Sequence, residues 1–170
     1  KLPGLSRRRV LVIGSGMVGQ EVVAGLLARG CDCDWAYFRN APAVSGEEAQ
    51  RVRVVQLDQL GDVLPEAEAI VSAVDVREPV LTVAKHAARL NPQGVVMVDL
   101  GMPHNIDPAF DRCGGAIHVA DLDVLKHWYR SANGTLDKIL EACRAILADH
   151  RSIYERMRLS IQGEANGRNC

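Results

Sequence analysis

The chain has 170 residues, 48% of them hydrophobic, and a formal net charge of −1 at pH 7. This length allows one ordinary domain with an appended element, and the apolar content is enough for a buried core. The near-zero charge gives no electrostatic reason to expect nucleic acid or an anionic membrane as a partner. No apolar run reaches the ~18 residues that a membrane-spanning helix needs, so we expect no membrane association.

The chain has five cysteines, which is an odd number, and their spacing fits no zinc template. We therefore expect no metal site and a reduced, cytoplasmic protein. Cys31 and Cys33 are one residue apart, which leaves open a redox pair or half of a metal site. The prediction is that both lie in a turn between a helix and a strand. The chain starts at Lys1 instead of Met, so the sequence leaves open whether it is whole.

Apolar runs alternate with helical segments through the first 120 residues. This alternation predicts an α/β fold with a doubly wound, mostly parallel sheet of the Rossmann type, covered by helices on both faces. Residues 43–50 are polar and too short for more than one or two helical turns. The predicted strands are residues 9–13, 35–39, 52–55, 69–74, 94–100 and 115–120, and the predicted helices are 17–29, 58–64 and 79–90.

The pattern changes after residue 120. Acidic residues from Asp121 onward mark the first turn of a helix. A second helix is expected after Asn133 and Gly134, and its apolar or semi-apolar positions follow a 4-3 spacing typical of a coiled-coil seam. We expect this seam to form a homodimer, with packing against the sheet as the alternative. The seam consists of Leu136, Leu140, Cys143, Leu147, His150, Tyr154 and Met157.

This pattern divides the chain into three parts. We expect a nucleotide-binding domain over residues 1–120 and a helical extension over residues 121–160 that serves as a dimerisation element. Residues 161–170 are predicted to be a flexible tail.

The most informative motif is a glycine-rich turn directly after the first predicted strand. Residues 10–19 read VLVIGSGMVG, so Gly14, Gly16 and Gly19 form G-x-G-x-x-G between a strand and a helix. In a dinucleotide-binding domain the first glycine permits the tight turn, the second admits the pyrophosphate and the third lets the helix pack on the strand. The helix N-terminus adds free N–H groups and a partial positive charge. The predicted cofactor-binding residues here are Gly14, Ser15, Gly16, Met17, Val18 and Gly19.

The end of the second predicted strand bears on cofactor choice. NAD-binding domains usually place a carboxylate there to bind the ribose hydroxyls, but this chain has Arg39 and Asn40 after Tyr37 and Phe38. Arg39 can pair with the 2′-phosphate of NADP, so NADP(H) is the predicted cofactor and NAD the less favoured one. The alternative is an arginine on a solvated strand end.

Two further strand ends complete the predicted cofactor site. The fourth strand ends in Ser72, Ala73 and Val74 at the carboxyl edge, where such sheets bind ligands. The alternative is that Ser72 is simply a small polar residue in a strand. At the end of the fifth strand we expect Asp99, Leu100 and Gly101 near the nicotinamide. Gly101 would let the ring approach the backbone, and Asp99 is expected to hold the following turn rather than transfer a proton.

Two segments carry a resemblance to a known family. Residues 98–108 read VDLGMPHNIDP, and residues 118–126 read HVADLDVLK. In glutamyl-tRNA reductases a glycine-rich nucleotide loop precedes I-D-L-(A/G)-x-P-R-(D/N)-I-D-P and then D-(V/L)-D-x-L, the entry into a long dimerisation helix. From about residue 7 to residue 121 the chain resembles the NAD(P)-binding domain of this family, with the start of the dimerisation helix beyond.

The resemblance has three departures. Val74 replaces the threonine of the family's S-A-T, and Arg39-Asn40 inverts the order of its N-R-(T/S). His104 stands where the family usually has arginine. As a catalytic candidate, His104 is expected either to bind a phosphate or carboxylate when protonated or to act as an acid near neutral pH; a histidine facing water is the alternative.

The resemblance implies a function. The family uses NADPH to reduce the glutamyl group of glutamyl-tRNA to glutamate-1-semialdehyde in tetrapyrrole synthesis, after a cysteine of a separate N-terminal domain has formed a thioester. That domain is not in this sequence, so we expect the chain to need an acyl-holding domain or partner and to meet aminoacyl-tRNA only indirectly. Two alternatives are a nucleotide-binding paralogue with a regulatory role and a dehydrogenase like those of the sirohaem pathway.

Overall fold

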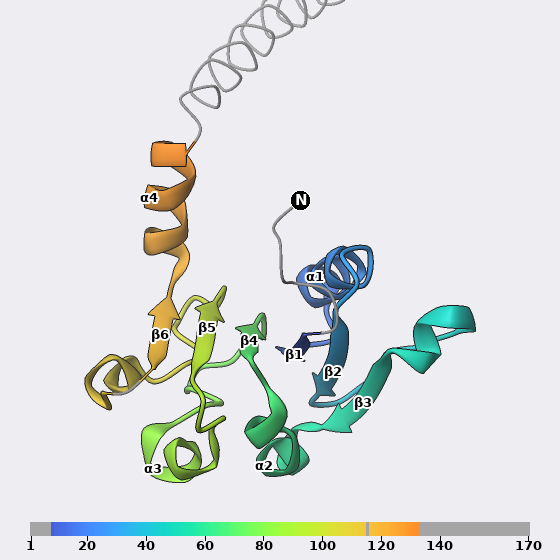
Figure 1. Cartoon of the computed structure of the whole chain (residues 1–170), viewed down its shortest axis with the longest axis horizontal. Helices are drawn as coiled ribbons and strands as arrows, with labels where there is room; N and C mark the ends of the chain where they lie inside the picture. Colours follow the sequence, from blue (N-terminus) through green and yellow to red (C-terminus); the bar gives the residue numbers. More distant parts are fainter. Residues whose placement is uncertain (1–7, 115, 133–170) are drawn as a thin grey trace, which may run out of the picture. The chain divides into compact units, whose positions relative to one another are not determined.

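The computed structural model describes residues 8–114 and 116–132. They form six strands with helices and 3₁₀ turns between them (Figure 1). The strands are β1 (Arg9–Ile13), β2 (Asp32–Tyr37), β3 (Val52–Gln56), β4 (Ala69–Ser72), β5 (Val95–Asp99) and β6 (Ile117–Ala120). The α-helices are α1 (Met17–Leu27), α2 (Leu60–Val63), α3 (Val83–His86) and α4 (Leu122–Ala132), and η1 (Gly46–Gln50) and η5 (Pro108–Arg112) are the longer 3₁₀ helices.

The sheet is parallel throughout and has the order β3-β2-β1-β4-β5-β6. The chain runs outward from β1 to β3, returns to β4 beside β1 and then runs outward to β6. Because all strands point the same way, their carboxyl ends share one edge, and the switch in direction falls between β1 and β4. This confirms the predicted doubly wound Rossmann architecture.

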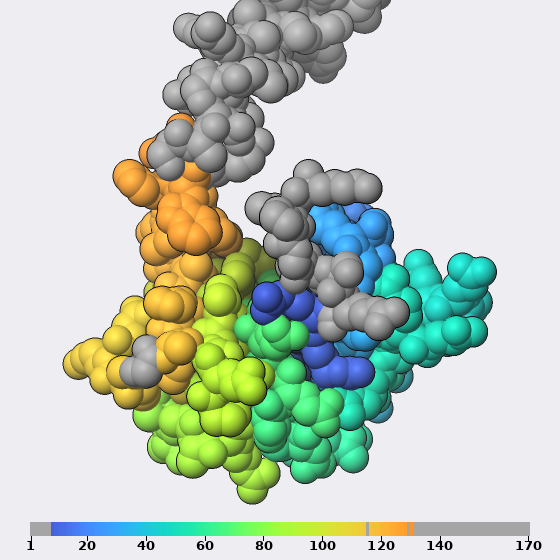
Figure 2. Space-filling model, viewed as in Figure 1, coloured from blue at the N-terminus to red at the C-terminus, as the bar shows by residue number. Residues whose placement is uncertain are grey.

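Two hydrophobic cores lie on opposite faces of the sheet. Alternate residues of β1 divide between them: Leu11 and Ile13 join the core beneath α2 and α3, and Val10 and Val12 join the core beneath α1. Figure 1 shows α1 on one side of the sheet and α2 and α3 on the other. Side chains fill the spaces between the ribbons (Figure 2).

Part of the α1 face is less covered than the sequence predicts. Val96 on β5 is 46% exposed, and His118, its register partner on β6, is exposed as well. His118 therefore lies outside the core, although it stands on a predicted strand, because α1 packs over β1 and β2 and no other described helix covers this position.

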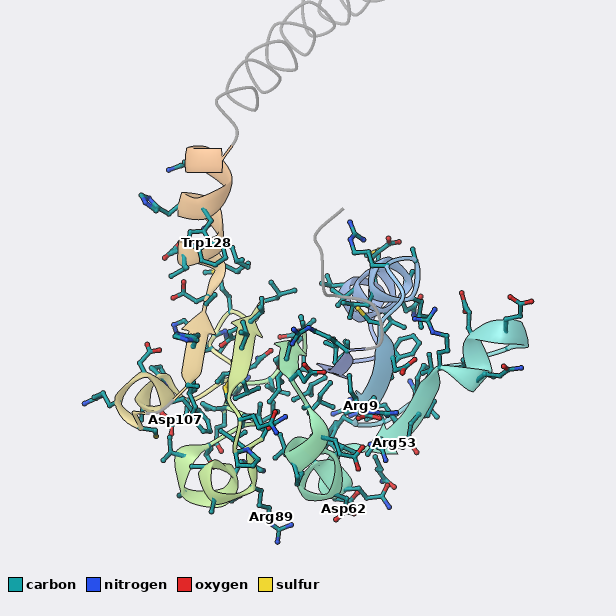
Figure 3. The ribbon with its side chains drawn as sticks, in the orientation of Figure 1. Arg9, Arg53, Asp62, Arg89, Asp107 and Trp128 are labelled. Carbon is teal, nitrogen blue, oxygen red and sulfur yellow. The ribbon has the colours of Figure 1, made fainter. Side chains whose placement is uncertain are left out.

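The second strand begins three residues earlier than predicted, so Cys33 lies inside it and not in a turn. Cys31, Cys33 and Trp35 are buried in the core beneath α1. Asp34 points to the other face, where it is fully buried and paired with Arg9 (2.8 Å) and Arg53 (2.7 Å). Both arginines are labelled in Figure 3. The hydrogen bond to Asp34 raises the pKa of Arg53, so these paired charges stabilise a strand whose sequence looks polar.

The helix predicted over residues 79–90 is also shorter. Helix α3 covers Val83–His86 and continues as a 3₁₀ turn through Arg89. The residues before it are extended because the N–H groups of Val80 and Leu81 donate to the carbonyl of Asn105. The Leu81 carbonyl accepts the Asp107 N–H, whereas in a helix from residue 79 it would accept the N–H of residue 85.

The residues divide into two compact units, 1–125 and 126–170. Of the second unit, the structure describes residues 126–132, the end of α4. The predicted seam and tail lie outside the described residues, so the proposed division at residues 120 and 160 stays a prediction.

Candidate functional site

The glycine-rich turn has the geometry that its sequence predicts. Gly14 has a φ of 121°, and a Cβ there would collide with the carbonyl of Ala73 on the neighbouring strand end. At Gly19 a Cβ would collide with the carbonyl of Gly14, so this glycine lets α1 approach the turn. Both glycines are therefore required by the fold itself.

Gly16 differs from its two neighbours. Its φ of −74° and ψ of −177° suit any residue, and a Cβ there would meet nothing within 4 Å. It occupies the N-cap of α1, where Gly is accepted about as well as Thr and where Ser, Asp or Asn would serve the helix better. Neither the backbone conformation nor the packing of the folded chain requires glycine at this position, and the free space lies directly in front of the helix N-terminus.

Two side chains hold the turn in place. The indole N–H of Trp35 donates to the carbonyl of Gly14 at 2.8 Å inside the core, and the Ser15 hydroxyl donates to the carbonyl of Asn40 at 2.9 Å. Ser15 thus connects the turn to the segment after β2. The N–H groups of Met17, Val18 and Gly19, in the first turn of α1, have no acceptor within the helix, as in any helix.

A hollow of about 420 Å³, here called the loop hollow, opens beside this turn. It brings together most of the cofactor residues predicted from the sequence, which come from the ends of β1, β2 and β4. These are Gly14, Ser15, Gly16, Met17, Val18, Arg39, Asn40, Ala73 and Val74. The structure thus assembles nine predicted residues from three separate segments around one space.

A second hollow, of about 510 Å³, shares Phe38 with the loop hollow and is here called the Phe38 hollow. Gln56, Asp58, Lys85 and His86 give it polar character. Burial lowers the pKa of His86, and the charges of Lys85 and Arg89 act in the same direction, against a hydrogen bond with Thr82. Sequence reasoning missed this hollow because its walls come from α2, α3 and the end of β3.

Arg39 lines the loop hollow next to Phe38, the residue that both hollows share. Its guanidinium carbon is 5.6 Å from the centroid of the Phe38 ring, and both side chains are exposed. Within the described residues Arg39 forms no ion pair, and the two residues on either side of it are not acidic. The side chain is therefore available to an anionic ligand.

The other predicted residues lie outside the loop hollow. Ser72 is fully buried and donates its hydroxyl to the Asn105 carboxamide, which makes it a structural residue in this conformation. The Leu100 N–H donates to the carbonyl of Ser72 and Leu100 is half-buried. Gly101 is buried, and a Cβ there would collide with the side chain of Asn105. Glycine at position 101 thus makes room for Asn105, whereas we had expected it to make room for a ligand.

Asp99 holds the turn after β5, as predicted. Its carboxylate is 1% exposed and accepts three backbone N–H groups. One oxygen binds Gly101 at 2.9 Å, and the other binds Asn105 at 2.9 Å and Ile106 at 3.0 Å. His104 lies beside it, with Nδ1 3.4 Å from Oδ2 of Asp99 and a side chain that is 53% exposed.

Asn105 is the residue that sequence reasoning missed. It is fully buried, and its carboxamide oxygen accepts bonds from the Ser72 hydroxyl and the Val74 N–H. Its backbone carbonyl accepts the N–H groups of Val80 and Leu81. Asn105 therefore connects the ends of β4 and β5 to the segment before α3, and the sequence signal available was an asparagine within the strand-5 motif.

Three further observations concern only the residues that the structure describes. No cluster of three or more His, Cys, Asp or Glu side chains is arranged to hold a metal ion there. None of the described helices is long and apolar enough to cross a membrane. The thiols of Cys31 and Cys33 are buried, and the thiol of Cys113 is exposed.

Taken together, the parallel sheet with this strand order, the glycine turn at its switch point and the hollow in front of it define a Rossmann-type dinucleotide-binding domain. Residues 1–128 match the family described as shikimate / quinate 5-dehydrogenase, and the chain belongs to this family.

Individual relatives narrow the comparison to glutamyl-tRNA reductases. The enzyme of Chlorobium limicola is 30% identical over 165 residues, which are 92% of this chain and 36% of that protein. Glutamyl-tRNA reductase from Methanopyrus kandleri superposes with a TM-score of 0.60 at 22% identity, covering 76% of this chain and 34% of that one. The nucleotide-binding domain of glutamyl-tRNA reductase from Thermoplasma volcanium gives 0.51 at 15% identity, covering 81% and 88%.

These relatives confirm the resemblance predicted from the strand-5 motif. The structural similarities, at these identities, concern the fold. The chain spans about a third of the length of the curated relatives it matches. It is thus a glutamyl-tRNA reductase-like NAD(P)-binding domain.

Proposed function

We propose that this chain binds NADPH and positions it for hydride delivery in a glutamyl-tRNA reductase-like enzyme of tetrapyrrole synthesis. The observation that carries the proposal is Gly16, a glycine that the backbone does not need and that faces open space at the N-terminus of α1. A pyrophosphate in that space would be met by backbone N–H groups and the positive end of the helix dipole. The loop hollow provides the space for such a ligand.

Arg39 supports NADPH over NADH. Its exposed guanidinium borders the loop hollow, at the strand end where a carboxylate would otherwise bind the ribose hydroxyls. A 2′-phosphate there gains a charge-assisted, bidentate pair. NAD is the less favoured cofactor because its ribose carries a free 2′-hydroxyl, which offers Arg39 no negative charge.

In the complete reaction NADPH would supply the hydride, and an acyl-holding cysteine domain or partner would present the glutamyl group. Aminoacyl-tRNA would then meet this chain only through that domain. We also propose that the chain is a homodimer in the cytoplasm, paired through the apolar seam of residues 136–157. This part of the proposal is supported by the heptad spacing and by the family resemblance.

The first experiment is a calorimetric titration of the full chain with NADPH and, separately, with NADH. We expect NADPH to bind at least about tenfold more tightly, which corresponds to about 1.4 kcal/mol. Gly16→Asp should abolish binding because a carboxylate would fill the space and repel the pyrophosphate. If neither nucleotide binds the wild-type chain, the proposed function is wrong and the glycine turn is a feature of the fold alone.

Arg39→Ala tests cofactor choice. The substitution should weaken NADPH by roughly 10- to 100-fold, the range for a charged hydrogen bond of about 1.5–3 kcal/mol, and should leave NADH nearly unchanged. Arg112→Ala, an exposed arginine on η5, is the matched control. An equal loss for both nucleotides would exclude recognition of the 2′-phosphate by Arg39.

Dimerisation is tested separately. Leu147→Glu places a charge in the predicted seam and should shift the chain to a monomer in analytical ultracentrifugation. A mutant that stays dimeric would place the interface elsewhere.

A further inference from the structure

A third hollow, of about 100 Å³, lies where β5 and β6 end, and is here called the His104 hollow. Its polar walls are His104 and three carboxylates, Asp99, Asp111 and Asp121. Ile106 and Val119 are among the apolar residues that close it. The loop hollow, at about 420 Å³, is four times larger. The His104 hollow is therefore suited to one small polar group and not to a whole ring system.

Asp99 lies beside His104 and is close to one of its two ring nitrogens. Three backbone N–H groups fix the carboxylate, and its Oδ2 lies 3.4 Å from Nδ1 of the imidazole. A carboxylate beside Nδ1 favours the tautomer with hydrogen on that nitrogen, as it does in carboxylate–histidine pairs generally. The other ring nitrogen, Nε2, is then a hydrogen-bond acceptor.

The charges around the hollow select the kind of ligand group. Asp111 and Asp121 present carboxylate oxygens, and Nε2 of an imidazole that carries its hydrogen on Nδ1 is a further acceptor. A carboxylate or phosphate would meet like charges, which argues against the anion-binding role considered for His104 from the sequence. A primary amide offers two N–H donors and carries no charge, so it suits this lining better.

The position of the hollow agrees with one half of a dinucleotide. Asp99 ends β5 and Asp121 follows β6, so both lie at the sheet edge that carries the glycine turn after β1. Strand β5 is two strands away from β1, which is about 10 Å at the usual strand spacing. With the pyrophosphate at Gly16, the nicotinamide riboside would extend over β4 toward β5.

We propose that His104, positioned by Asp99, accepts a hydrogen bond from the carboxamide NH₂ of the nicotinamide ring, and that Asp111 and Asp121 disfavour a carboxylate in its place. This inference rests on the proposed function, because it requires a pyridine nucleotide in the loop hollow. It makes His104 a residue that recognises the reactive end of the cofactor and Asp99 a positioning residue.

The test uses three ligands of the full chain in calorimetric titrations: NADP⁺, its analogue with nicotinic acid in place of nicotinamide, and 2′-phospho-ADP-ribose, which has no pyridine ring. Wild type should bind NADP⁺ about tenfold more tightly than the acid analogue. His104→Ala should weaken NADP⁺ about 3- to 10-fold, the range for one hydrogen bond, and leave 2′-phospho-ADP-ribose unchanged. His118→Ala, an exposed histidine on β6, is the control.

A second variant tests the carboxylates without touching His104. Asp121 accepts the N–H groups of Asp123 and Val124 as the N-cap of α4, and asparagine caps a helix equally well, so Asp121→Asn should fold normally. It should bind the acid analogue several-fold more tightly than wild type does and bind NADP⁺ about equally well. Circular dichroism checks that each variant is folded.

The outcomes separate the two proposals. If 2′-phospho-ADP-ribose and NADP⁺ both fail to bind, the proposed function fails. If both bind, but His104→Ala changes neither or weakens both equally, the nicotinamide contact is wrong while the proposed function stands. Equal affinity of wild type for NADP⁺ and the acid analogue would also overturn the contact. Should NADH prove the tighter ligand, the counterparts without the 2′-phosphate are used.

Discussion

The two loops at the carboxyl edge of the sheet use glycine in opposite ways. In the turn after β1, Gly16 faces open space and the first N–H groups of α1 are left without partners from the helix. In the turn after β5, Gly101 is packed against Asn105, and the N–H groups of Gly101, Asn105 and Ile106 all donate to Asp99. The first loop leaves its backbone N–H groups available to a ligand, whereas the second loop uses its backbone N–H groups to hold its own conformation.

This contrast shows how a site is recognised in a domain of this kind. A glycine that the fold requires and a glycine that a ligand requires look alike in a sequence. They differ in whether a side chain would collide with the protein. The two loops also differ in their backbone N–H groups, which are either already paired within the protein or available to a phosphate.

The largest effect is expected for Asp99→Ala, which breaks the second loop. It leaves three buried N–H groups without an acceptor, at about 1–3 kcal/mol each, so we expect a loss of roughly 3–9 kcal/mol in the free energy of unfolding. This is a large part of the 5–15 kcal/mol typical of a domain. Urea denaturation measures it, with the exposed Asp111→Ala as control. A loss below about 1 kcal/mol would show that the loop does not depend on Asp99.

Alanine at the two glycines sharpens the contrast directly. Gly101→Ala should destabilise the chain by about 1–3 kcal/mol because the new methyl group overlaps the Asn105 carboxamide. Gly16→Ala should cost at most about 1 kcal/mol of stability, because alanine is a poorer N-cap residue than glycine, and should still weaken NADPH binding. Thermal unfolding measures the stability of both variants, and nucleotide titration measures their affinity for NADPH. A stable Gly101→Ala, or a Gly16→Ala that binds normally, would contradict the distinction.

A smaller effect is expected for Trp35→Phe, which removes the indole bond to the Gly14 carbonyl. The loss of one hydrogen bond should reduce the free energy of unfolding by about 1 kcal/mol. Trp128→Phe is the matched control, because Trp128 is 65% exposed where Trp35 is 6% exposed. If the two variants have equal stability, the indole does not hold the turn.

The smallest effect concerns the cysteines beneath α1. Burial raises the pKa of Cys33 to about 12 and also raises the pKa of Cys31, so both thiols stay protonated in the folded chain. Residue-resolved alkylation at pH 8 should modify the exposed Cys113 and spare both until the chain unfolds. Rapid modification of Cys33 would contradict its burial.

The same shift has a defined pH dependence. The folded pKa of Cys33 lies above the usual value of 9.0, so its contribution to stability is complete below pH 9 and is lost as the pH rises toward 12. Unfolding at pH 8 and pH 10.5 should show this loss, and Cys33→Ala should reduce the difference between the two. An equal difference in the variant would assign the pH dependence to other groups.

Local patterns in the sequence were sufficient for the sheet and for the first loop. Strand β1 and the start of α1 lie where predicted, and β3 to β6 agree to within a few residues, because each is an apolar run bounded by turn residues. The glycine turn was predictable because its G-x-G-x-x-G motif lies within six consecutive residues. The strand-5 motif likewise indicated the family before any tertiary contact was known.

Tertiary structure alone decided the features that depend on partners distant in sequence. The start of β2 was missed because Asp34 is tolerated in a buried strand only with Arg9 and Arg53 beside it on the neighbouring strands. The start of α3 was missed because Leu81 pairs with Ile106 and its carbonyl, which a longer helix would use, accepts the Asp107 N–H. Ser72 and Gly101 likewise contact Asn105 and not the loop hollow. Hydrophobic periodicity and turn chemistry are local in a chain, whereas the pairing of buried polar groups depends on which segments the fold brings together.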